Sequence, residues 1–180
     1  MAAVGRRLRV WGEGPQVFQR YEANRKFLAD CPKRVAEIFR HWEESRGERS
    51  MPRRADLGLE NLVIYLPGIT LVDIEGTDDQ GVGIFRYSFV GAAEVSLRGK
   101  DPSGTLVTES YWGPSLEDVI GCYEFVRRQK SFLYDATPYL TPIGKFSCEA
   151  TLFLPLSEDG VTVSQVLVYS IEQGTGAVSS

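Results

Sequence analysis

Residues 84–91 (IFRYSFVG) constrain the fold of this chain most strongly, because their side chains alternate with the period of two of a half-buried strand. Phe85, Tyr87 and Phe89 would lie on one face of such a strand. A second apolar run, residues 69–74, precedes it across the turn-rich segment GTDDQGVG. The pattern predicts an antiparallel hairpin near the centre of a sheet.

Three other segments have the spacing of an amphipathic helix. The first covers residues 16–29 and predicts an N-terminal helix that docks on the domain or on a second subunit. The second begins after Asp30, a possible cap, and Gly47 is a suitable stop. Its predicted buried stripe is Val35, Ile38, Phe39 and Trp42. The third is residues 115–131, where Ser115 is the expected cap and the last turn is basic.

The end of the chain contains three further β-type runs, residues 131–140, 145–156 and 161–172. Short helical stretches broken by glycines precede them. We therefore predict an α+β fold, a five-stranded antiparallel sheet with helices packed on one face, plus N-terminal helices. Residues 1–29 are expected to form a helical extension, residues 30–171 one domain, and residues 172–180 a disordered tail.

Composition restricts the class of protein. The 180 residues are 43% hydrophobic and have a net charge of −4, which argues against a nucleic-acid binder. The basic stretch at residues 46–54 is interpreted as an exposed connector. Apolar runs are far shorter than the roughly 20 residues of a membrane span, and the N-terminus lacks the apolar region of a signal peptide. We expect a cytoplasmic protein without membrane contact.

The order of elements resembles the PAS fold. It consists of a leading hairpin, small helices, one longer helix and three trailing strands. Particular segments resemble those of a family of small, stand-alone PAS-type proteins of alphaproteobacteria, over residues 30–171. These segments are PRRAD at 52–56, LPGITLVDIE at 66–75, FRYSFVGA at 85–92, LRGKDPSG at 97–104 and LPLSEDG at 154–160.

The resemblance implies a sensory or protein-interaction module that binds a small ligand or a partner and passes on a conformational or dimerisation signal. We expect a homodimer formed through the N-terminal helix. The sequence has no kinase, cyclase or DNA-binding segment, so output would pass through a regulatory protein partner. A pocket between the sheet and the helices is the expected ligand site, with one of the arginines contacting an anion. Its predicted lining is Arg54, Arg86, Tyr87, Phe89, Trp112, Tyr123 and Leu154.

Little in the sequence indicates catalysis or a cofactor. The single histidine, His41, lies on an apolar helix and is interpreted as structural. Zinc is not expected because ligands do not cluster. Haem and flavin are not expected either, since residues 91–130 lack a histidine and an Asn-Cys-Arg-like segment. The cysteines are expected to be reduced, partly buried thiols. They are Cys31, Cys122 and Cys148.

Two alternatives to a sensory module stay open. One is a small enzyme with a carboxylate base in an apolar pocket, for which Glu149 on a predicted strand is the candidate. The other is a purely structural adaptor with a filled core. An open cavity with a bound ligand would favour the sensor, and a buried carboxylate in a cleft would favour the enzyme.

Overall fold

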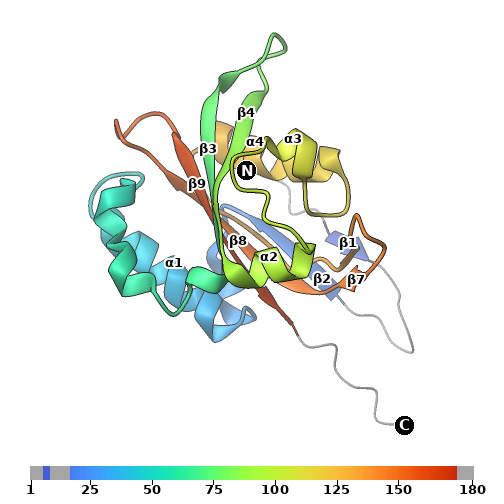
Figure 1. The fold of residues 1–180 in the computed structure, drawn as a ribbon. Helices are drawn as coiled ribbons and strands as arrows, with labels where there is room; N and C mark the ends of the chain where they lie inside the picture. The colour runs from blue at the N-terminus through green and yellow to red at the C-terminus, as the bar shows by residue number, and fades with distance from the viewer. Residues whose placement is uncertain (1–5, 9–16, 174–180) are drawn as a thin grey trace.

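The computed structural model describes residues 6–8 and 17–173 (Figure 1). Its main feature is an antiparallel sheet with the strand order β1-β2-β5-β8-β9-β3-β4, in which β1 extends the edge of the six other strands. These strands are β1 (Arg6–Leu8), β2 (Val17–Glu22), β3 (Ile69–Thr77), β4 (Gly83–Val90), β5 (Leu133–Asp135), β8 (Glu149–Leu156) and β9 (Gln165–Glu172). A separate two-stranded arm consists of β6 (Tyr139–Leu140) and β7 (Phe146–Ser147).

The predicted leading hairpin is confirmed, since β3 and β4 pair from Thr70↔Val90 to Thr77↔Gly83. Its predicted place near the centre of the sheet is wrong, because β4 is an edge strand. The three trailing runs also supply strands, and the α+β class with an antiparallel sheet is confirmed. The predicted number of five strands is wrong, because the segment before the domain adds to the sheet.

The predicted helix at residues 16–29 is wrong. Residues 17–22 form β2, which pairs with β5 at Tyr21↔Tyr134, and only a 3₁₀ turn, η1 (Arg25–Ala29), follows. Without β2 the edge of β5 would expose unpaired backbone groups, and strand addition satisfies them. The remaining N-terminal residues and the predicted tail at 174–180 lie outside the described residues.

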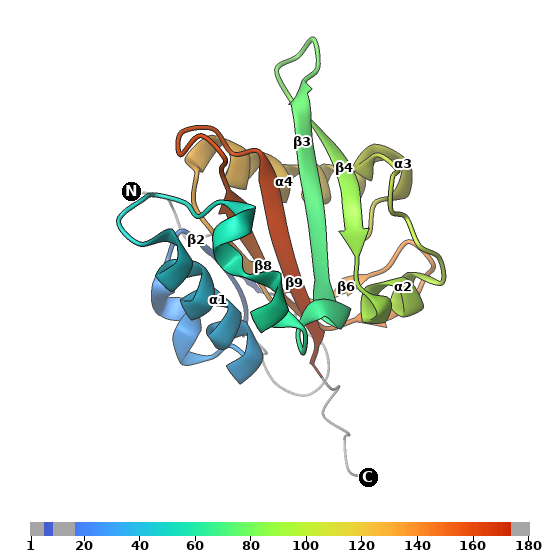
Figure 2. The same ribbon diagram turned by 60° about the vertical axis from the view of Figure 1, so that its left-hand side comes forward.

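Helices cover both faces of the sheet, so the prediction of one covered face is wrong (Figure 2). The reason is that β8 is apolar on both sides: Leu152 and Leu154 pack toward α1, whereas Phe153 packs toward α4. A strand that is apolar on both faces needs cover on both. The helices are α1 (Lys33–Arg46) on one side and α2 (Ala92–Arg98), α3 (Val107–Ser110) and α4 (Leu116–Gln129) on the other.

The two longer helices largely follow their sequence signals. Gly47, with a φ of 56°, ends α1, but Pro32 rather than Asp30 occupies its N-cap. The predicted stripe of α1 is buried. Ser115 caps α4 by accepting a hydrogen bond from the backbone N of Asp118. Three 3₁₀ turns connect α1 to β3, namely η2 (Arg54–Leu57), η3 (Leu59–Leu62) and η4 (Leu66–Gly68).

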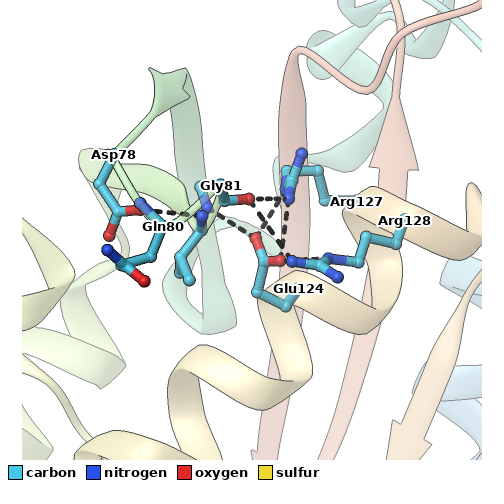
Figure 3. Close-up of polar contacts among 8 residues, drawn as sticks. Asp78, Gln80, Gly81, Glu124, Arg127 and Arg128 are labelled. Atoms are coloured by element: carbon cyan, nitrogen blue, oxygen red, sulfur yellow. Dashed lines mark hydrogen bonds and ion pairs between the residues drawn. The ribbon is translucent and has the colours of Figure 1, made fainter.

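Glu124 and Arg127 of α4 attach the start of β4 and the loop before it to the helix (Figure 3). The Glu124 carboxylate accepts hydrogen bonds from the backbone N of Gly83 at 2.7 Å and from Nε of Arg127 and Arg128, both at 2.6 Å. Burial opposes ionisation of Glu124, but these hydrogen bonds outweigh it and lower its pKa to about 2. The contact fixes α4 over the sheet.

We expect Trp42→Phe to destabilise the protein by about 2 kcal/mol, because Trp42 Nε1 donates to the buried carbonyl of Pro155 at 2.9 Å and the substitution leaves that acceptor unpaired. Urea unfolding measures the change. Trp112→Phe is the matched control, since Nε1 of Trp112 is buried without a hydrogen-bond partner. Equal losses for both variants would contradict the assignment of the cost to the Trp42 hydrogen bond.

Within the described residues, no helix is both long and apolar enough to cross a bilayer.

Candidate ligand-binding site

A cavity of about 570 Å³ lies between the sheet and the helices α2 and α4. Phe153 and Val168 are part of its floor, Val119 and Tyr123 of α4 form one wall, and Tyr139 of the β6–β7 arm lies at its border. Its volume falls within the roughly 300–1,000 Å³ of pockets for small molecules.

The strand register gives the cavity a polar floor. Arg20, Asp135, Thr151 and Ser170 are consecutive cross-strand partners on β2, β5, β8 and β9, and all four line the cavity. Partners in register share a face of the sheet. Arg20 lies 3.8 Å from a carboxylate oxygen of Asp135, and burial raises the pKa of Asp135. One end of the cavity therefore has its own ion pair.

Arg98 at the end of α2 supplies a buried positive charge at the other end. Its side chain is only 7% exposed, and its guanidinium lies 4.9 Å from the ring centre of Tyr87 and 5.9 Å from that of Trp112. The closest carboxylate oxygen, on Glu94, is 4.0 Å from Nη2. Nε and Nη1 have no hydrogen-bond partner. A buried guanidinium with so few partners is costly unless another group satisfies it.

Two buried carboxyl groups accompany Arg98. Burial, together with the nearby Glu149, raises the pKa of Glu94 to about 8, although Arg98 opposes the shift. Burial also raises the pKa of Glu149, against the hydrogen bond that it accepts from the Tyr139 hydroxyl. We call Glu94, Arg98 and Glu149 the buried charge cluster.

Neither the protein-family models nor the curated proteins contain a match to this sequence.

Of the seven residues predicted to line a pocket, Trp112 and Tyr123 line this cavity, and Tyr87 lies against Arg98. Two others lie away from it on the surface. Arg54 is exposed, and its backbone N donates to Glu158. The side chain of Arg86 pairs with Glu75 at 2.6 Å.

The remaining two, Phe89 and Leu154, face α1 on the opposite side of the sheet. The prediction that Phe89 shares a face with Tyr87 is wrong, because a register shift occurs between the pairs Leu71↔Phe89 and Val72↔Tyr87. Such a bulge inserts one extra residue and reverses the alternation. On β8, Phe153 rather than Leu154 faces the cavity.

Sequence reasoning did not identify Glu94 and Arg98. Their spacing of four residues places them on one face of a helix, which was a usable signal. The glycines on either side of this short helix made its helical pattern difficult to recognise. Glu149 was named only for the enzyme alternative, and it is buried with a raised pKa as that alternative requires.

His41 does not line the cavity, whereas one of the cysteines, Cys122, does. Nε2 of His41 is 2.6 Å from the carbonyl oxygen of Leu57, a structural contact. The three cysteines are free thiols. Across residues 6–8 and 17–173, no group of three His, Cys, Asp or Glu side chains is placed to hold a metal ion.

Proposed function

We propose that this protein is a PAS-like sensory module that binds a small molecule in the cavity between the sheet and α2 and α4, without catalysis. The observation that carries the proposal is the cavity itself, into which Arg98 and Trp112 contribute buried nitrogen atoms without hydrogen-bond partners. Buried donors are normally satisfied, and a bound ligand would satisfy these.

The order of elements also supports a PAS-like module. The hairpin β3–β4, the helices α2 to α4 and the trailing strands β5, β8 and β9 follow each other in the order that the resemblance implies. Fold likeness alone does not establish function, so the cavity carries more weight than the topology.

Native mass spectrometry of the freshly purified protein, beside a denatured sample and an absorption spectrum, tests the proposal. We expect a mass excess that disappears on denaturation. Thr151→Phe should abolish the excess by filling the cavity from the floor, whereas Thr77→Phe, the same change at an exposed position of β3, should leave it intact. A protein that purifies without a ligand and binds none from a metabolite library would contradict the proposal.

A regulatory protein partner and a homodimer are part of the same proposal. The dimer was expected through an N-terminal helix, but residues 17–22 belong to the sheet, so another surface must form it. Sedimentation across a range of protein concentrations measures the oligomeric state, and a monomer at every concentration would remove the dimer.

Catalysis by a carboxylate base is the second candidate function. It is favoured by the raised pKa values of Glu94 and Glu149 beside a cavity, which is typical of general bases. This function would be supported if the wild type converted a bound compound into a chemically altered product and the Glu149→Gln variant did not. A purely structural adaptor has less support, because the interior is not filled.

A further inference from the structure

The buried charge cluster combines both signs of charge without pairing them fully. Nη2 of Arg98 and the carboxyl oxygen of Glu94 are 4.0 Å apart, which is too far for a hydrogen bond. Glu149 is 5% exposed, and the side chain of Glu94 is 7% exposed. All three groups therefore lie out of water, and Arg98 keeps two donors free at the cavity.

The charges of the cluster restrict the ligand. A simple anion would satisfy Arg98 but would give the two carboxyl groups no hydrogen-bond donor, and a simple cation would leave the guanidinium unsatisfied. A molecule that carries a carboxylate and an ammonium group on one carbon matches both signs at this short separation. Guanidinium groups bind carboxylates by charge-assisted, often bidentate hydrogen bonds, and an ammonium group donates three.

The geometry points to a zwitterionic ligand of the α-amino acid type, whose carboxylate accepts hydrogen bonds from Arg98 and whose ammonium group donates to Glu94 and Glu149. This inference rests on the proposed function, because it requires that a small molecule occupies the cavity.

The aromatic wall of the cavity would receive an apolar side chain of this ligand, whereas the floor is polar. Trp112, Tyr123 and Phe153 line it, and the rings of Tyr123 and Phe153 meet edge to face at 5.6 Å. The volume of about 570 Å³ leaves room for a large side chain beside the zwitterionic group. At the far end, Arg20 lies 3.3 Å from a carboxylate oxygen of Glu22 and 3.8 Å from one of Asp135, so its charge already has two carboxylate partners.

Binding should release a proton. Free Glu94 is mostly protonated near neutral pH, whereas the ammonium group requires its ionised form, so affinity should increase as the pH rises from 6 to 8. The other charged and titratable groups around the cluster come from β4, α4, β6 and β9. They are Tyr87, Tyr123, Tyr139 and Glu172. Burial raises the pKa of Tyr123 and Tyr139, so both stay neutral in this range.

Isothermal titration of the full chain with the common amino acids, each at pH 6 and pH 8, tests the inference. For phenylalanine, the matched probes are 3-phenylpropionate, which lacks the ammonium group, and 2-phenylethylamine, which lacks the carboxylate. We expect at least one apolar amino acid to bind, both of its truncated analogues to bind at least tenfold more weakly, and its affinity to be at least tenfold higher at pH 8 than at pH 6.

Variants separate the two charges. Arg98→Met and Glu94→Gln should each weaken binding of the amino acid at least tenfold, whereas Arg40→Met, an exposed change on α1 across the sheet, should not. Circular dichroism checks that each variant is folded. If a variant fails to fold, the titrations of the wild type with the two analogues and at two pH values still decide whether the ligand is an amino acid.

The outcomes distinguish the two proposals. Tighter binding of the carboxylate analogue, or affinity that falls between pH 6 and pH 8, would overturn the amino acid class but leave a ligand sensor. A copurified ligand without an ammonium group would do the same. No binding in titration and no mass excess in native mass spectrometry would overturn both.

Discussion

Gly91→Ala should destabilise the protein by about 3 kcal/mol, because a Cβ atom at this position has no space. It would lie 2.1 Å from the carbonyl oxygen of Leu66 and 2.4 Å from that of Pro67. Both contacts are with backbone, so no side chain can rotate to relieve them. The φ of Gly91 is −66°, which any residue adopts, so the cost comes from packing alone.

Urea unfolding at neutral pH measures this loss. Gly121→Ala is the matched control, since a Cβ atom there meets nothing within 4 Å and the residue lies inside α4. Alanine in a helix interior is favoured over glycine by up to about 1 kcal/mol, so the control should be as stable as the wild type or more so. Gly91 immediately precedes α2, so its substitution should also displace Arg98 and weaken binding of the proposed ligand in the cavity. A Gly91→Ala protein of wild-type stability would contradict the close approach of η4 to this turn.

Glu94→Gln should stabilise the protein at pH 8 by up to about 4 kcal/mol. Glutamine resembles the neutral form that Glu94 keeps in the folded protein, where burial raises its pKa from 4.5 to about 8. Between these pH values the unfolded chain loses the proton and the folded protein retains it. Wild-type stability therefore falls as the pH rises through this window. The loss is absent below pH 4.5, where Glu94 is protonated in both the folded and the unfolded chain.

The measurement is the free energy of unfolding of both proteins between pH 4.5 and pH 9. The difference should be close to zero at the acid end and grow by up to about 1.4 kcal/mol per pH unit toward pH 8. Glu149 retains its own titration in both proteins. Glu48→Gln, at an exposed position, is the control and should show no such trend. A pH-independent difference for Glu94→Gln would mean that Glu94 is ionised in the folded protein.

The elements that could be predicted from the sequence are those whose signals are local. The hairpin of β3 and β4 follows from two apolar runs around a turn, and α1 and α4 follow from a stripe of apolar residues with a suitable stop or cap. Backbone hydrogen bonding and burial within a short segment are sufficient to select these structures. Trp112, just before α4, and Tyr123, on the buried face of α4, could be assigned to a pocket on the inner side of that helix.

The other features of the fold and of the site depend on contacts between elements that are distant in the chain. Residues 17–22 become a strand because the edge of β5 needs a partner, and the bulge in β4 turns Phe89 away from Tyr87. The buried charge cluster joins α2 to β8, more than fifty residues apart in the chain. Its properties depend on desolvation and on neighbouring charges, which exist only once distant elements have packed together. A sequence pattern reports local geometry, and the environment of a buried charge is not local.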